Sequence, residues 1–107
     1  MLADLARRYR LVLLSNTNAI HYQALCQRYP LLDYFQHRVL SFEVKALKPE
    51  AKIFECAIEA AGCPPQQCFY TDDIAAYTEA ARHLGIDAVT FESATQLERE
   101  LRLRNIF

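Results

Sequence analysis

Short apolar runs alternate with amphipathic segments along the whole chain. Runs typical of buried strands lie at 11–14, 38–41, 68–71 and 88–91, and stretches with apolar residues at helical spacing lie between and around them. This alternation predicts parallel strands joined by crossover helices. We therefore predict the α/β class: a Rossmann-like parallel sheet with helices on both faces, in a single domain over 1–107.

Capping and breaking residues mark the helix boundaries. After a loop over 43–48, Pro49 begins the best-marked helix, which Gly62 ends. Ser93 is placed to cap a terminal helix. The chain has only two glycines, and we expect both Gly62 and Gly85 at backbone conformations that other residues adopt with difficulty.

Composition and charge exclude several functional classes. With 107 residues, 52% hydrophobic and 23% charged, the chain is globular rather than disordered. No apolar run approaches the ~18 residues that span a bilayer, so we expect no membrane partner. A net charge of -1 provides no attraction to nucleic-acid phosphates. Residues 1–8 do not resemble a secretory signal, and we expect a cytoplasmic protein.

The four cysteines form no C-x-x-C pair, which favours reduced thiols over a disulfide framework. Cys56 and Cys68 stand in apolar runs and are expected to be buried structural thiols. Metal binding or redox chemistry is the alternative for them.

A polar cluster follows the first apolar run. Residues 15–18 read Ser-Asn-Thr-Asn and lie where a strand meets the start of a helix. Backbone N–H groups and the helix dipole suit such a place to a phosphate. The alternative is that these residues only cap the helix.

Two carboxylates follow the third apolar run. Asp72 and Asp73 stand at a strand's carboxyl end, where one or two carboxylates suit Mg²⁺. The alternative is that Asp73 caps the next helix and Asp72 is merely solvated. Lys48 could place a positive charge beside a phosphoryl group, although a single lysine is more often a solvated surface residue.

In this order and on these elements, the clusters resemble the motifs of the haloacid dehalogenase-like (HAD) hydrolases, most of which are phosphohydrolases. Residues 11–16 resemble the family's second motif, 41–54 the third and 69–85 the fourth. The segment 14–18, with His21, is similar to sugar-phosphate phosphatases of the glucose-1-phosphate type. The resemblance covers essentially the whole chain.

The resemblance implies a role for each candidate residue. Ser15 and Lys48 are the implied catalytic residues, and they bind the phosphate together with Asn16. Asp72 would bind Mg²⁺, the implied cofactor, with support from Asp73. We expect Ser15, Lys48 and Asp72 to converge on one phosphoryl pocket.

The family's first motif has no counterpart in these residues. That motif is an Asp nucleophile with a second Asp two positions later, and no apolar run here ends in Asp-x-Asp. The usual cap segment is missing as well, so the chain corresponds to the C-terminal part of an ordinary member's core. Lys45 stands where Gly is common and Tyr77 where Asn is usual, which affects pocket shape and metal support.

Loss of that motif has chemical and structural consequences. The aspartyl nucleophile also ligates Mg²⁺ in this family, so we expect weak or no Mg²⁺ binding and no useful phosphatase activity from the isolated chain. Its strand would lie at the centre of the sheet, which predicts two separate strand pairs. Their unpaired edges leave three outcomes open: the two halves close up and pair directly, the chain self-associates, or a partner chain supplies the missing strand.

Two functional hypotheses follow from the sequence. The first is a fragment of a HAD-like phosphomonoester phosphatase, which acts on a small phosphorylated metabolite when a partner completes it. The alternative is a non-catalytic phosphate- or metal-binding module with a regulatory role. A receiver-type signalling domain is excluded by motif order, because here the acidic pair comes after the lysine.

Overall fold

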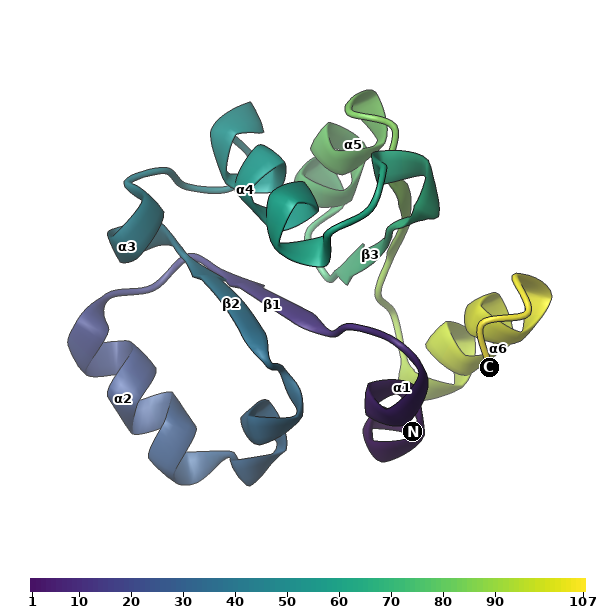
Figure 1. Cartoon of the computed structure of the whole chain (residues 1–107), viewed down its shortest axis with the longest axis horizontal. Helices are drawn as coiled ribbons and strands as arrows, with labels where there is room; N and C mark the ends of the chain where they lie inside the picture. The colour runs from purple at the N-terminus through teal and green to yellow at the C-terminus, as the bar shows by residue number, and fades with distance from the viewer. The chain divides into compact units, whose positions relative to one another are not determined.

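The computed structural model describes residues 1–107 and confirms the predicted α/β alternation (Figure 1). The chain forms two compact units, Met1–Cys63 and Pro64–Phe107. The elements of the first unit are α1 (Leu2–Arg8), β1 (Val12–Ser15), α2 (Ala19–Arg28), the 3-10 turn η1 (Pro30–Tyr34), β2 (His37–Leu40), α3 (Ser41–Val44) and α4 (Ala51–Ala61). Those of the second are the 3-10 turn η2 (Pro65–Gln67), β3 (Phe69–Asp72), α5 (Ala75–His83), β4 (Asp87–Thr90) and α6 (Ala94–Leu103).

The four strands form two separate two-stranded sheets, as expected. β1 pairs with β2 in parallel, and the register ends where Ser15 lies opposite Leu40. β3 pairs with β4 in parallel, and that register ends where Asp72 lies opposite Thr90. In both sheets a candidate site residue therefore stands at the carboxyl end of its strand.

The core of the first unit lies between its sheet and α4. This helix contacts both β1 and β2, and its side chains Ile53 and Phe54 are fully buried. They occupy the apolar stripe that the sequence predicts for this helix. Gly62 ends α4 with φ at 73°, a left-handed conformation that glycine adopts without strain.

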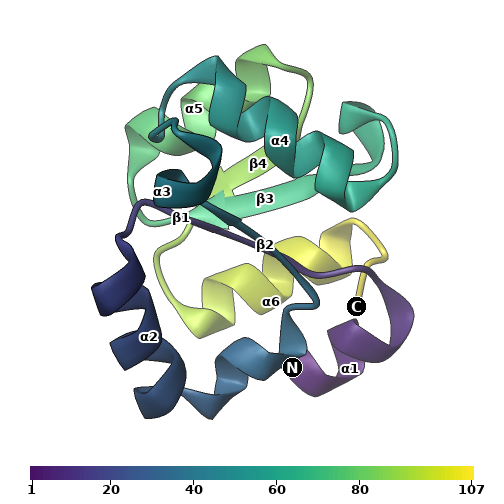
Figure 2. The ribbon, with the colours of Figure 1, turned by 60° about the vertical axis from the view of Figure 1, so that its left-hand side comes forward.

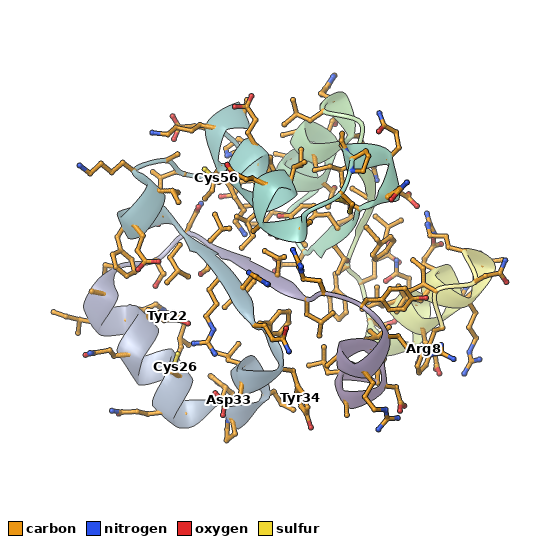
Figure 3. The ribbon with its side chains drawn as sticks, viewed as in Figure 1. Arg8, Tyr22, Cys26, Asp33, Tyr34 and Cys56 are labelled. Atoms are coloured by element: carbon orange, nitrogen blue, oxygen red, sulfur yellow. The ribbon has the colours of Figure 1, made fainter.

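Arg38 of β2 connects α2 and η1 to the sheet. Its guanidinium donates to the hydroxyl of Tyr22 at 2.5 Å and to the carbonyl oxygens of Leu32 and Phe35 at 3.0 and 3.2 Å. Cys26, near Tyr22 on α2 (Figure 3), lies 3.8 Å from the same guanidinium. The half-buried guanidinium of Arg38 thus links α2, which has no fully buried side chain, to the sheet through polar contacts.

In the second unit the helices lie on both faces of the sheet. Figure 2 shows α5 on one side of β3 and β4 and α6 on the other. Ala81 and Thr78 of α5 are fully buried, and Leu101 of α6 is nearly so. Gly85 follows α5 with φ at 89°, so both glycines serve the backbone role expected of them.

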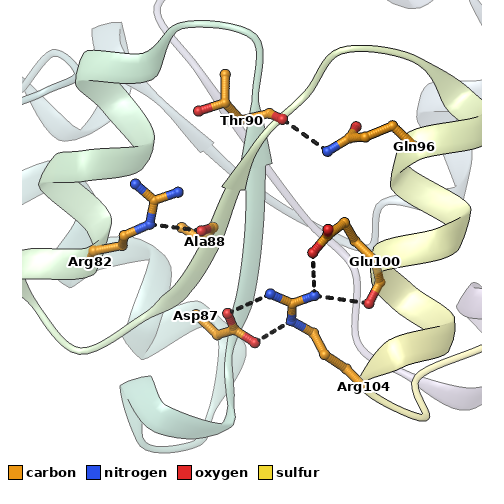
Figure 4. Close-up of polar contacts among 7 residues, drawn as sticks. All are labelled: Arg82, Asp87, Ala88, Thr90, Gln96, Glu100 and Arg104. Atoms are coloured by element: carbon orange, nitrogen blue, oxygen red, sulfur yellow. Dashed lines mark hydrogen bonds and ion pairs between the residues drawn. The ribbon is translucent and has the colours of Figure 1, made fainter.

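A cluster around Arg104 attaches the end of α6 to β4 (Figure 4). The guanidinium binds Asp87 at 2.6 and 3.2 Å and Glu100 at 2.7 Å. It also lies over the ring of Phe69, 5.2 Å from the centroid. The side chain of Arg104 is only 25% exposed, so these contacts are less screened than an ordinary surface ion pair.

The structure differs from the sequence prediction at several places. Residues 41–44 form α3, where a strand end and a loop were expected, and α4 begins at Ala51 rather than at Pro49. The Lys48–Pro49 peptide is cis. Cys56 and Cys68 are half-buried, not buried, and all four cysteines are free thiols.

The helices are short, and the longest, α4, has 11 residues. None combines the length and the apolar content required to cross a membrane.

We predict that Arg104→Ala lowers the free energy of unfolding by about 1–2 kcal/mol, because it removes hydrogen bonds to two carboxylates and a ring contact. Urea denaturation measures the effect. Arg99→Ala is the matched control, since Arg99 is exposed on the same helix and should cost less than about 0.5 kcal/mol. Equal losses in the two variants would contradict the role of the cluster.

Candidate functional site

The candidate residues fall into two groups, one in each unit. Ser15, Asn16 and Lys48 belong to the first unit, and Asp72 and Asp73 belong to the second. Each group is described by itself below.

The side-chain amide of Asn16 joins the end of β1 to the segment before α4. Its Oδ1 accepts from the backbone N–H of Lys48 at 2.8 Å, and its Nδ2 donates to the carbonyl oxygen of Lys48 at 3.2 Å. Both polar groups of one amide thus bind both backbone groups of one residue. The structure brings Asn16 and Lys48 together across 32 positions of sequence.

The ammonium of Lys48 lies beside the end of the same strand. Its Nζ is 3.4 Å from the carbonyl oxygen of Leu14, and the residue is half-buried. Ser15, the next residue, is half-buried at the last position of the β1–β2 register. The hydroxyl of Ser15 and the ammonium of Lys48 therefore both lie near the carboxyl end of β1. A hydrogen-bond donor and a positive charge at one place suit the binding of an anion.

Only part of the polar cluster caps the helix that follows. Asn18 is the N-cap of α2, and its side chain accepts from the N–H of His21 at 2.8 Å. Ser15 and Asn16 lie before that cap. The capping interpretation is therefore right for Asn18, and it does not account for Ser15 and Asn16.

In the second unit, Asp72 is held by two hydrogen bonds. Its Oδ1 accepts from the N–H of Ile74 at 3.0 Å, and its Oδ2 accepts from the hydroxyl of Tyr70 at 2.7 Å. Asp73 is exposed, and the N-cap of α5 is Ile74, which makes no side-chain cap. The alternative in which Asp73 caps α5 and Asp72 is merely solvated is wrong.

Burial raises the pKa of Tyr70 far above its ordinary value, and the hydrogen bond to Asp72 raises it further. Ionised Tyr70 would place a second negative charge against the carboxylate of Asp72. The phenol therefore remains a hydrogen-bond donor to Asp72 at physiological pH.

The acidic pair fits a magnesium ion. Both carboxylates stand at the end of β3, Asp72 as its last residue and Asp73 directly after it. Mg²⁺ typically uses one or two protein carboxylates together with water and substrate oxygens. No three His, Cys, Asp or Glu side chains gather into a denser metal site.

In each unit a candidate side chain stands at the carboxyl end of a parallel strand, where ligands bind in open α/β sheets: Ser15 ends β1 and Asp72 ends β3. The sequence profile of the haloacid dehalogenase-like hydrolases matches residues 1–85. The chain belongs to this family.

Relatives of known structure support the same conclusion. A HAD-family enzyme of Bacteroides thetaiotaomicron, crystallised with magnesium and inorganic phosphate, is 37% identical with a TM-score of 0.80. The match covers 90% of this chain and 53% of that enzyme. A predicted HAD-like family hydrolase of Porphyromonas gingivalis is 27% identical with a TM-score of 0.82, over 94% of this chain and 54% of that protein.

A sugar-alcohol phosphate phosphatase is also similar in sequence. The D-ribitol-5-phosphate phosphatase of Bacteroides thetaiotaomicron is 27% identical over 103 residues, which are 91% of this chain and 50% of that enzyme. The chain thus spans about half the length of each of these three relatives.

The structure adds two residues that the sequence analysis did not select, Tyr70 and Ser41. Tyr70 lies in a predicted strand and in the fourth-motif segment, but no role was predicted for it. Residues two apart on a strand face the same side, which could have linked Tyr70 to Asp72. Ser41 contacts the loop after β1 through Thr17, and no local pattern indicated that contact.

We predict that Tyr70→Phe changes the alkaline stability of the Mg²⁺-free protein. Folded Tyr70 keeps a proton that the unfolded chain releases above pH ~10, so the free energy of unfolding falls as the pH rises past that value. Removing the phenol hydroxyl should reduce the slope of the free energy of unfolding against pH by up to about 1.4 kcal/mol per pH unit. Urea denaturation at a series of pH values measures this slope.

The matched control for that experiment is Tyr9→Phe, because Tyr9 is 43% exposed. Its alkaline stability profile should follow that of the wild type. Identical slopes in Tyr70→Phe and the wild type would contradict the assignment of a raised pKa to Tyr70.

Proposed function

We propose that this chain provides the phosphate- and magnesium-binding part of a HAD-like phosphomonoester phosphatase. The observation that carries the proposal is the pair of hydrogen bonds between the side chain of Asn16 and the backbone of Lys48. These two bonds connect the segment that carries Ser15, in the second motif, to the segment that carries Lys48, in the third motif.

In this proposal Ser15, Asn16 and Lys48 bind the phosphoryl group. The Ser15 hydroxyl and the backbone N–H of Asn16 donate hydrogen bonds to phosphate oxygens. Lys48 offsets the negative charge, which is redistributed over these oxygens in the transition state. The side chain of Asn16 keeps the Lys48 backbone in place.

Asp72 would hold Mg²⁺, with Asp73 in support. When bound, the ion would supply a positive charge to the phosphate oxygens during transfer. The hydrogen bonds from Tyr70 and Ile74 orient the Asp72 carboxylate before any ion binds. Magnesium and phosphate in the crystals of the Bacteroides relative support this assignment.

The proposed substrate is a small phosphorylated metabolite of the sugar- or polyol-phosphate kind, in the cytoplasm. The sequence likeness to a D-ribitol-5-phosphate phosphatase supports this class. These 107 residues contain no Asp-x-Asp, so a nucleophile must come from other polypeptide. We expect the 107 residues alone to turn over sugar phosphates more slowly than about 1 s⁻¹ with Mg²⁺.

The second candidate function is a non-catalytic phosphate- or metal-binding module. The absence of Asp-x-Asp from these residues favours it. Phosphate binding that never leads to turnover, even with polypeptide carrying that motif, would support this candidate over the phosphatase fragment.

We predict that Lys48→Ala weakens the binding of inorganic phosphate by about tenfold or more, because a hydrogen bond to a charged group is lost. Isothermal titration calorimetry on the full chain measures the dissociation constant. Lys52→Ala removes the same charge from an exposed position on α4 and should bind like the wild type. Equal weakening in both variants would indicate a nonspecific charge effect and contradict the proposal.

We also propose that the unpaired edges of the two-stranded sheets, left by the missing nucleophile strand, pair with another strand, either in a second copy or in a partner chain. Each sheet has only two strands, and unpaired strand edges favour association. In sedimentation velocity runs of the purified chain, the average sedimentation coefficient should therefore rise with protein concentration. A strict monomer with a sharp, concentration-independent melting transition would contradict this proposal.

A further inference from the structure

The hydroxyl of Ser41 holds the residue that follows the candidate phosphate-binding pair. Its Oγ accepts from the N–H of Thr17 at 2.8 Å and donates to the carbonyl oxygen of Thr17, also at 2.8 Å. The two contacts fix the directions of both backbone groups of one loop residue. Ser41 is 6% exposed, so water competes poorly for these bonds.

The position of Ser41 follows from the strand register. The parallel ladder ends where Ser15 lies opposite Leu40, and Ser41 is the next residue of that chain segment. There the backbone turns into α3, so it does not continue the ladder. Beyond the last paired residues, the side chain of Ser41 joins the two chain segments through its hydrogen bonds to Thr17.

Asn16 and Thr17 are therefore anchored at two places. The side chain of Asn16 binds the Lys48 backbone, and the backbone of Thr17 binds the side chain of Ser41. The Thr17 N–H is directed at Ser41, so Ser41 does not add a donor for an anion. Ser41 instead fixes the backbone conformation of the segment that carries Ser15 and Asn16.

We propose that Ser41 is a positioning residue for the phosphate site, which acts by fixing the turn after Ser15 and Asn16. This inference rests on the proposed function, since it assumes that those two residues bind phosphate. Without the hydroxyl, both backbone groups of Thr17 lose their partner, and the turn is free to reorient.

The test compares three variants of the full chain by calorimetric titration with inorganic phosphate. Ser41→Ala should raise the dissociation constant by about tenfold. Ser41→Thr keeps the hydroxyl and should bind within about threefold of the wild type. Thr78→Val is the matched control, because it removes another fully buried hydroxyl, in α5, and should bind within the same range.

The outcomes separate this inference from the proposed function. If the wild type binds phosphate and Ser41→Ala binds equally well, the positioning role is overturned while the proposed function stands. If Ser41→Ala and Thr78→Val weaken binding equally, the effect is general destabilisation and the positioning role is again overturned. If the wild type binds no phosphate, the proposed function fails and the inference fails with it.

A variant that does not fold still leaves a decisive measurement. Should Ser41→Ala not fold, Ser41→Cys takes its place, because cysteine is close to serine in size and is a much weaker hydrogen-bonding group. The same loss of phosphate binding is expected from Ser41→Cys. Wild-type affinity in that variant would overturn the positioning role.

Discussion

Two hydrogen bonds between the side chain of Asn16 and the backbone of Lys48 connect the segments on which the proposed phosphate site depends. Strand ladders alone could not make this connection, because Lys48 lies in a loop after α3 and outside the β1–β2 register. An asparagine side chain has a donor and an acceptor in the spacing of a peptide group, so it can pair with the backbone as a strand would. Loss of that pair would release the lysine segment from the end of β1.

The same principle recurs at two other places where a strand in this protein ends. Ser41 continues the β1–β2 contact through its hydroxyl, and Asp72 receives the N–H of Ile74 after β3. Short strands supply few ladder bonds, and short polar side chains satisfy the backbone beyond them. The groups proposed for chemistry thus lie next to backbone that side chains hold in place, which favours a preorganised site.

Much of this organisation can be predicted from the sequence. The strand and helix order follows from apolar periodicity, and the end of α4 at Gly62 follows from capping chemistry. Ser93 caps α6 as predicted and accepts from the N–H of Gln96 at 3.1 Å. These features are local, so a few neighbouring residues in the sequence are enough to predict them.

The features that escaped prediction depend on contacts between distant positions. The sequence around Ser41 is compatible both with a strand end and with a helix start. Ser41 begins α3, and its hydroxyl contacts Thr17, which is 24 positions away and outside any local pattern. The half-burial of Cys56 on α4 also depends on tertiary packing, which its apolar neighbours in sequence do not reveal. The roles of the candidate site residues were implied by motif resemblance, and they remain proposals.

A nuclear magnetic resonance titration of the isotopically labelled chain with inorganic phosphate tests the central claim most directly. The account predicts saturable shifts that are largest for the amides of Ser15, Asn16 and Lys48. Shifts confined to the exposed arginines of α6, Arg99 and Arg102, or no saturable shift at all, would contradict it.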